Sequence, residues 1–213
     1  MKWNNLEFWK YGEWDVIKEI LRDKRNQGIL YNPSHSNLFQ AMEAVPFKEV
    51  RVVVVGQDPY PEHRMATGIA FSIPPEIKKE DYPPTLKNIF KEYCSDLGYP
   101  YPETGDLSKW CKQGVFLWNA IPTCDAGKPK SHHYIHEWSY LTREIVEKLD
   151  EKGNCVFILL GRNAGSLLPL IRNSHVIQTS HPSPLGANKG FLGSKIFSRT
   201  NQLLEKPIDW RLE

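Results

Sequence analysis

The run of four valines at residues 52–55 limits most strongly what this chain can fold into. Four consecutive β-branched residues that end at a glycine, Gly56, are typical of a strand buried on both faces, as in the centre of a parallel sheet. A polar loop, residues 57–61, follows at once. Asp58 and Tyr60 each precede a proline, which favours extended backbone, and residues two apart in an extended segment point the same way. We therefore expect Asp58 and Tyr60 to project together from a stiff loop, unless the segment is only a proline-rich turn with a solvated carboxylate.

The length of the chain favours a single domain with one sizeable core, spanning residues 1–213. The net charge of +2, from 27 basic and 25 acidic residues, excludes a polybasic coating protein but allows a local basic face. The four cysteines are far apart and form no C-x-x-C pair, which favours reduced thiols over a zinc site or a disulfide framework. The N-terminus lacks an apolar leader, and no apolar run is long enough to cross a bilayer. We expect a soluble monomer in the cytoplasm, although a nuclear location is compatible with the sequence.

The order of elements along the chain predicts an α/β fold. Strands are expected at 51–55, 115–118, 155–160 and 175–179, with a short helix before the last of these. Apolar residues at helical spacing predict helices from Trp14 to Arg25 and from Trp138 to Leu149, and a final helix at 195–204. A further helix is expected after residue 85, with Thr85 as its N-cap and Gly98 just past its end. Alternating strands and helices predict a single-domain protein with a central four-stranded parallel sheet flanked by helices.

Polar residues follow each of the four predicted strands. They are Asp58, Asn119, the pair Gly161 and Arg162, and His181. Ligands of parallel α/β sheets bind outside the carboxyl ends of the strands, so we expect these side chains to share one cleft. An asparagine after a strand is otherwise a common turn residue.

Several kinds of site are disfavoured by missing motifs. The chain has no G-x-S-x-G elbow for a Ser-His-Asp hydrolase, no P-loop and no Rossmann glycine fingerprint. His132, His133 and His136 lie close together, and His132 and His136 have helical i,i+4 spacing. The glutamate of an H-E-x-x-H motif is absent, however, so a helix-capping or surface role is favoured over a metal site.

Recognition of a flat ring that carries amide groups fits the residues that are left. Asn119 offers a donor and an acceptor, as a paired base does. Phe71, in the short apolar segment 68–72, offers a face for stacking, although from spacing alone it is equally an ordinary core residue.

Two stretches resemble the signature motifs of the family 1 uracil-DNA glycosylases. The first is Gly-Gln-Asp-Pro-Tyr at 56–60 and the second is His-Pro-Ser-Pro-Leu at 181–185. The resemblance continues from about Trp14 to the C-terminus, with further matching stretches at 105–108, 112–115, 119–120, 190–198, 200–201 and 207–210. It implies an enzyme that flips uracil out of single- or double-stranded DNA and hydrolyses the N-glycosidic bond, with neither a metal nor another cofactor.

The resemblance also implies a role for each pocket residue. Asp58 would orient the attacking water and stabilise positive charge on the deoxyribose, and His181, as a neutral imidazole, would hydrogen-bond uracil O2. Asn119 would read the imide edge and reject cytosine. Phe71 would stack on the base, the Gln57 main chain would close the pocket, and Tyr60 would block the methyl group of thymine.

The remaining implied roles concern DNA. Leu185 would enter the base stack as an apolar wedge, where the alternative is a simple exposed loop leucine. Five residues would contact the phosphates that flank the lesion: Pro84, Thr85, Gly161, Arg162 and Ser183. Uracil-containing DNA is the expected partner, and a DNA-mimicking protein inhibitor is a second.

The chain departs from the family pattern at three positions. Pro61 stands where the family has histidine, which removes a donor and an ionisable group near Asp58. Arg162 replaces the serine of a Gly-Ser phosphate loop and adds charge, so DNA binding should depend more on salt. Gly186 replaces a serine after the wedge leucine and loses a phosphate contact. Two other hypotheses are therefore kept: a weakly catalytic DNA-binding or replication accessory protein, and a glycosylase with shifted base preference.

Overall fold

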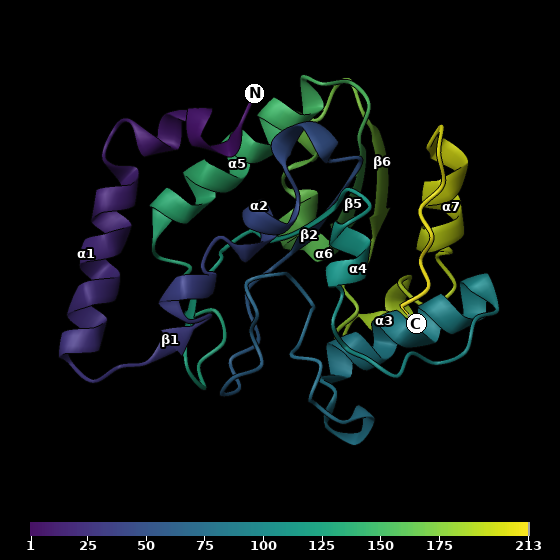
Figure 1. The fold of residues 1–213 in the computed structure, drawn as a ribbon, viewed down its shortest axis with the longest axis horizontal. Coiled ribbons are helices and arrows are strands. Elements are labelled where there is room, and N and C mark those ends of the chain that lie inside the picture. Colours follow the sequence, from purple (N-terminus) through teal and green to yellow (C-terminus); the bar gives the residue numbers. More distant parts are fainter. Residues whose placement is uncertain (213) are drawn as a thin grey trace.

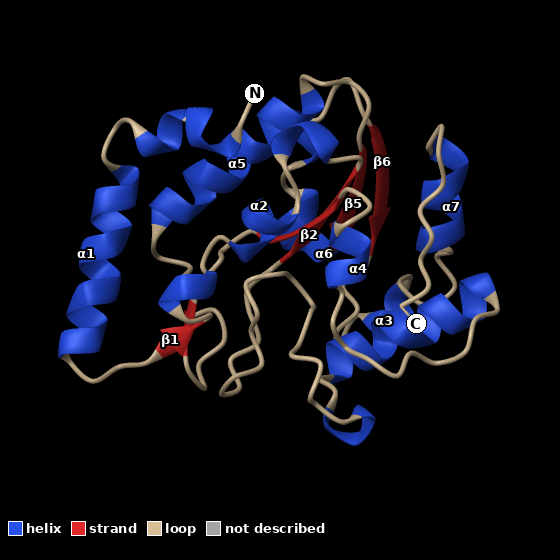
Figure 2. Ribbon diagram, viewed as in Figure 1, coloured by secondary structure: helices blue, strands red, loops and turns tan. Residues whose placement is uncertain are grey.

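The strand formed by the valine run lies inside a four-stranded parallel sheet. A computed structural model describes residues 1–212, and its main sheet has the order β3-β2-β5-β6. These strands are β2 (Val52–Gly56), β3 (Val115–Asn119), β5 (Val156–Leu160) and β6 (His175–Thr179). All neighbours are parallel, and every residue of β2, β3 and β5 is buried. The predicted parallel sheet, with β2 between two other strands, is confirmed, and Figure 2 shows β2, β5 and β6 of this sheet among the helices.

Helices occupy most of the chain between these strands. The α-helices are α1 (Glu13–Asn26), α2 (Gln40–Ala44), α3 (Pro84–Leu97), α4 (Ser108–Cys111), α5 (His136–Asp150), α6 (Gly161–Gly165) and α7 (Ile196–Leu203). Single turns of 3-10 helix lie at Trp3–Asn5, Glu7–Trp9, His35–Asn37, Phe47–Glu49, Lys79–Asp81, Leu168–Leu170 and Ala187–Lys189. The helices predicted from apolar spacing are present, with ends shifted by one or two residues. No helix in the described part of the chain is long and apolar enough to cross a membrane.

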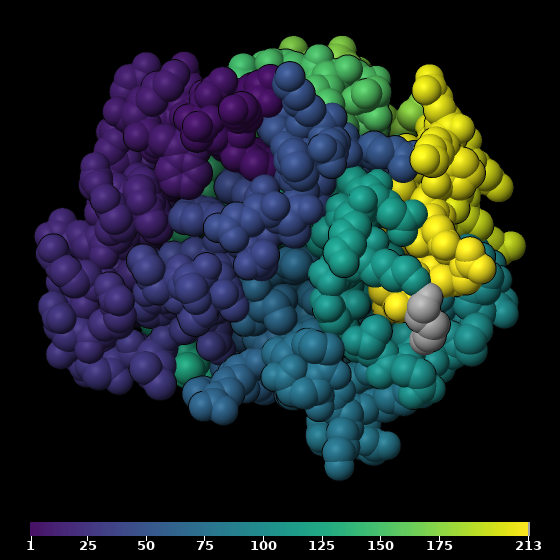
Figure 3. All heavy atoms as spheres, in the orientation of Figure 1, coloured from purple at the N-terminus to yellow at the C-terminus, as the bar shows by residue number. Residues whose placement is uncertain are grey.

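The sheet is the middle layer of three. Successive strand residues point to opposite faces, so Val54 and Leu117 lie on one face, among side chains of α3, α4 and α7. On the other face, the indole Nε1–H of Trp118 donates to Thr142 Oγ1 of α5 at 2.9 Å. Figure 1 shows α1 and α5 on one side of the sheet and α3 and α7 on the other, and Figure 3 shows α7 and the C-terminal segment beside the α3–α4 region on the surface. Both faces are therefore covered, which leaves the strand ends as the accessible part of the sheet.

The prediction that Thr85 caps α3 is wrong. The helix already begins at Pro84, its N-cap is Pro83, and no side chain caps it. Proline suits the first helical position because its φ is pre-set and its missing N–H would have had no partner there. The predicted end is confirmed, since Gly98 adopts the left-handed conformation that stops the helix (φ 69°).

The helical relation predicted between His132 and His136 is also wrong. Helix α5 begins only at His136, and His132 lies in the preceding turn. His132 is fully buried, which also overturns the expected capping or surface role. Its ring nitrogens lie 2.7 Å from Thr123 Oγ1 and from Asp125 Oδ1, and Asp125 is in turn bound by Lys24 of α1 at 2.8 Å.

A second, two-stranded sheet was not expected from the sequence. Strands β1 (Tyr31–Asn32) and β4 (Cys124–Asp125) pair antiparallel. Each has only two residues, too few for any alternation of apolar and polar side chains to be recognised. Through this pairing, the segment after α1 lies beside the segment that follows β3.

Candidate active site

The carboxyl ends of the four parallel strands bring the predicted site residues to one edge of the sheet. Asn119 is the last residue of β3, and Gly161 directly follows β5. Asp58 and His181 each stand two residues beyond the end of a strand, β2 and β6 respectively. This is the edge at which doubly wound sheets bind their ligands.

A glycine allows the amide of Asn119 and the ring of Phe71 to lie next to each other. Gly56 pairs with Asn119 in the sheet, and a Cβ atom on Gly56 would lie 2.6 Å from Asn119 Oδ1 and 2.9 Å from the Phe71 ring. A larger residue at position 56 would displace one of them. The Phe71 ring is buried, and its centroid lies 6.3 Å from that of His181. An amide, an aromatic ring and an imidazole therefore lie next to one another at this edge of the sheet.

The Phe71 backbone is strained, and Tyr60 is tied to it. Phe71 has a φ of 67°, in the left-handed region that a bulky residue rarely adopts. The Tyr60 hydroxyl donates to the Phe71 carbonyl oxygen at 3.2 Å. Burial raises the pKa of Tyr60, so the hydroxyl stays protonated and keeps donating this bond.

The loop that carries Asp58 and Tyr60 is held from outside by Asn32. Its side-chain Nδ2 donates to the carbonyl oxygens of Tyr60, Pro61 and Glu62 at 3.1, 2.9 and 3.2 Å. The Pro61 carbonyl also accepts from the N–H of Gly127 at 2.8 Å. The backbone around Pro61 is therefore fixed by β1 and by the turn after β4, although no histidine is present at this position.

Lys130 is the residue nearest to Asp58 that sequence reasoning missed. Its backbone N–H donates to Asp58 Oδ2 at 2.7 Å, and its φ of 64° is again left-handed. Strained backbone conformations of this kind cluster at functional sites. The only sequence signal was Pro129 in the Gly-Lys-Pro-Lys turn, and that signal does not say what the turn contacts.

His181 is held in one tautomer. Its Nδ1 accepts the N–H of Ser183 at 3.1 Å, so the neutral ring carries its proton on Nε2. Burial lowers the pKa of His181; the Lys130 charge acts in the same direction, while Asp58 acts against both. The ring is therefore poised as a neutral Nε2–H donor. Gly161 allows this approach, because its φ is 83° and a Cβ there would lie 2.9 Å from His181 Cβ.

The residues expected to contact DNA lie on two sides of His181. The Leu185 side chain is 86% exposed. Its loop is braced by Asn88 of α3, whose Nδ2 donates to the Pro182 carbonyl at 2.8 Å. This bond brings Ser183 and the start of α3, with Pro84 and Thr85, onto one surface.

Arg162 lies on the other side of the site, at the start of α6. It lines a cleft of about 370 Å³ together with Gln57 and Arg143. The Gln57 carbonyl accepts the N–H of Ile121 at 3.0 Å, which fixes the wall between this cleft and the strand ends. Within residues 1–212, no three His, Cys, Asp or Glu side chains are grouped so as to hold a metal ion.

The fold and this set of side chains define a class of protein: a parallel α/β protein with an amide, a carboxylate, an imidazole and an aromatic ring at the carboxyl ends of its strands. Comparison with known sequences makes the assignment specific. The sequence model of the Uracil DNA glycosylase superfamily matches residues 42–205. A uracil-DNA glycosylase of Mycolicibacterium vanbaalenii is 44% identical over 91% of this chain and 87% of its own. One from Thermobifida fusca is 43% identical over 91% and 86%. The chain belongs to the Uracil DNA glycosylase superfamily.

Solved structures agree with this assignment. The crystal structure of mimivirus uracil-DNA glycosylase superposes with a TM-score of 0.85 at 25% identity, covering 97% of this chain and 85% of that one. A single-residue variant of the mimivirus protein, solved in complex with UGI, superposes with a TM-score of 0.84 over 97% of this chain and 87% of that one.

Proposed function

We propose that this protein is a monofunctional uracil-DNA glycosylase that removes uracil from single- or double-stranded DNA in base excision repair and leaves an abasic site. The observation that carries the proposal is the meeting of Asp58, Phe71, Asn119 and the neutral, Nε2-protonated His181 at one sheet edge. The alternative, a weakly catalytic DNA-binding accessory protein, is not favoured, because the curated relatives are named as glycosylases.

In the proposed reaction the C1′–N1 bond breaks and its electron pair leaves with uracil. His181 Nε2–H donates to uracil O2 as negative charge gathers there, which is stabilisation of a developing oxyanion. The Asp58 carboxylate stabilises the positive charge on the sugar and orients a water molecule. The water oxygen forms the new bond to C1′, and the proton that the water loses neutralises the departing uracil anion, so the products are free uracil and an abasic deoxyribose.

Specificity rests on three side chains. Asn119 pairs with the imide edge of uracil, and cytosine leaves this amide mismatched; such a site discriminates by about 10⁴–10⁵. Phe71 stacks on the base. Tyr60 occupies the space of the thymine methyl group, and its bond to the strained Phe71 backbone keeps it there.

A uracil inside a duplex is reached only after the nucleotide has been flipped out of the base stack, which costs on the order of a few kcal/mol. Leu185 fills the vacated stack, and Pro84, Thr85, Gly161, Arg162 and Ser183 hold the flanking phosphates. The reaction that we propose uses neither a metal nor a cofactor. A DNA-mimicking inhibitor protein is a second partner that we propose, and the UGI complex of the mimivirus variant supports it.

The test is uracil release from an oligonucleotide with a single uracil, in the presence of a chelator, followed by alkaline strand scission. We expect cleavage at the uracil and none in a thymine control strand. No release would refute the glycosylase function, and release only after adding a divalent metal would refute the metal-free mechanism.

A further inference from the structure

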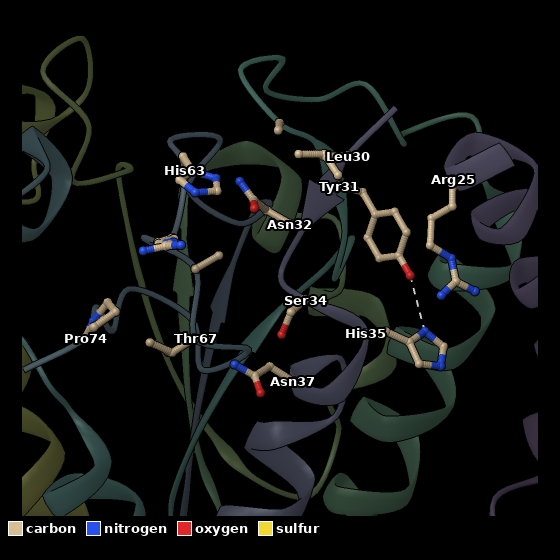
Figure 4. A pocket seen from close by; sticks show the side chains of 13 residues that line it. Arg25, Leu30, Tyr31, Asn32, Ser34, His35, Asn37, His63, Thr67 and Pro74 are labelled. Atoms are coloured by element: carbon tan, nitrogen blue, oxygen red, sulfur yellow. Dashed lines mark hydrogen bonds between the residues drawn. The ribbon is translucent and has the colours of Figure 1, made fainter. Parts of the chain in front are cut away.

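A second cleft opens beside the loop that carries Asp58 and Tyr60. Its volume is about 520 Å³, which is enough for a nucleotide-sized ligand. Its walls come from the end of α1, from the segment around β1 and from residues 63–67, and Figure 4 shows side chains from these segments facing one space. None of the roles described above uses this cleft.

The ionisable side chains that line the cleft include two arginines and two histidines but no acid. Arg25, His35, His63 and Arg64 are among the lining residues, with no aspartate or glutamate. All four are exposed, and the salt bridges formed within residues 1–212 include neither arginine. Two unpaired guanidinium groups in a cleft without acids favour an anionic ligand, above all a phosphate.

The same cleft offers flat rings and amides. Tyr31 forms part of the wall, and its hydroxyl lies 3.2 Å from His35 Nδ1 (Figure 4). Arg25 lines the same part of the cleft, and Figure 4 shows its guanidinium on the side of that hydroxyl. Imidazole rings next to guanidinium groups suit the bases of a single strand, which stack on such rings while the phosphates meet the cations.

The cleft is joined to the catalytic loop by covalent and hydrogen bonds. Asn32 lines the cleft, and its side chain binds the backbone carbonyls of residues 60–62. His63 and Arg64 follow this stretch directly. Arg64 has a left-handed φ of 60°, a conformation that costs free energy for a non-glycine residue. A strand that leaves the uracil pocket along this loop therefore meets the two basic side chains first.

We propose that this cleft binds the phosphates and bases of single-stranded DNA a few nucleotides away from the uracil, as an extension of the substrate path on one flank. The inference rests on the proposed function, because it takes DNA as the polyanion. The ligand chemistry, a phosphate ester with a planar base, is shared with free nucleotides, so the experiment must separate the two.

The test compares the double variant Arg25→Gln/Arg64→Asn with Arg22→Gln. Asparagine tolerates the left-handed backbone at position 64. Arg22 is an exposed control on the same helix, paired with Glu19 and Asp23. Binding is measured by fluorescence anisotropy with uracil-free thymidine oligonucleotides over a range of salt concentrations. Turnover is measured on a uracil trinucleotide and on long single strands extended on one flank or the other.

For the double variant we expect the salt slope of long-strand binding to be shallower by about 1.4, or about 0.7 for each lost phosphate contact. Long-strand affinity should fall roughly tenfold or more, as for lost hydrogen bonds to charged groups. The double variant should lose turnover only on long strands that are extended on one of the two flanks, and it should turn over the trinucleotide at the wild-type rate. The Arg22→Gln control should behave as the wild type in every measurement.

An unchanged salt slope, or an equal loss on both flanks and on the trinucleotide, would overturn the proposal. A second experiment adds thymidine monophosphate as the ligand and monitors the His35 and His63 rings by NMR. Shifts with the monophosphate but none with the thymidine oligonucleotide would make this a free-nucleotide site and also overturn it. Failure of the proposed function would show as a wild-type protein that does not turn over the uracil trinucleotide. The binding measurements still test the cleft in that case, because oligonucleotide binding requires no catalysis.

Discussion

The Nδ1 atom of His181 accepts the backbone N–H of Ser183 at 3.1 Å, so the neutral ring carries its proton on Nε2. Burial lowers the pKa of this ring, and protonation would place a hydrogen on Nδ1, the atom that now accepts the bond from Ser183. We predict by ¹⁵N NMR that His181 is the neutral Nε2–H tautomer at pH 7 and titrates below the ordinary value of about 6.5. Uracil release should fall as the pH drops through that pKa, because the imidazolium loses its bond to Ser183. A ring that titrates above 6.5 would contradict this mechanism.

Lys130 should influence His181 through its charge. The lysine lowers the His181 pKa, while its backbone N–H binds Asp58. Lys130→Gly keeps that N–H and suits the left-handed φ of 64°. We predict that His181 titrates at a higher pH in this variant and that the acid limb of the activity profile moves the same way. Lys128→Gln, in the same turn, is the control. If both variants leave the titration of His181 where it is, the Lys130 charge does not reach the ring.

Two substitutions of Tyr60 separate the effect of its ring on base selection from the effect of its hydrogen bond. Under the proposed gating role, Tyr60→Ala should open the space of the thymine methyl group and allow thymine excision. Tyr60→Phe keeps the ring and loses only the bond to the Phe71 carbonyl, so it should still reject thymine, with uracil excision reduced about tenfold or less, as for the net loss of one hydrogen bond. Both are measured on paired uracil and thymine oligonucleotides. Thymine that stays intact with Tyr60→Ala would exclude the gating role.

The sheet was predictable because buried parallel strands leave long apolar runs in the sequence. The valines of β2 and the polar residues after each strand are local signals, and the parallel order then fixes where those residues meet. The contact between Lys130 and Asp58 was not predictable, because it joins residues 72 positions apart through a turn with no periodicity. The start of α3 was misjudged for a local reason: a threonine that resembles an N-cap follows a proline that already begins the helix.

His132 shows the same limit at a buried site. Its spacing from His136 suggested a helix, while the structure uses it to join Thr123, Asp125 and, through Asp125, Lys24 of α1. The sequence does not predict this network, because the bonded residues lie at β4, in the turn before α5 and on the distant helix α1.

Loss of the His132 side chain should therefore destabilise the fold. His132→Ala leaves Thr123 and Asp125 without one buried partner each, at a cost of about 2–3 kcal/mol in the free energy of unfolding. His136→Ala, at an exposed position, should change stability by less than about 0.5 kcal/mol. Urea denaturation at pH 7.5 distinguishes the two. Burial lowers the pKa of His132 although Asp125 opposes it, so the unfolded chain binds this proton more readily. Wild-type stability should thus decline below about pH 6.5, and less steeply in His132→Ala. Equal stability of the two variants would mean that the network contributes nothing.

Arg162 tests how this chain differs from the family in its hold on DNA. It stands at the exposed start of α6 and lines a cleft together with Arg143, at a position where the family resemblance implies a serine. If its guanidinium binds a phosphate of duplex DNA, Arg162→Ser should reduce the salt slope of binding by about 0.9 and weaken binding equally for all sequences. Arg143→Ser shows whether the second arginine shares the contact, and Arg172→Ser, at an exposed position before β6, is the control. Fluorescence anisotropy with a uracil-free duplex gives the slopes without turnover. The whole expected change comes from one phosphate contact. An unaltered slope in Arg162→Ser would therefore mean that this side chain does not contact DNA, and that the Gly161 backbone and Ser183 bind the phosphates instead.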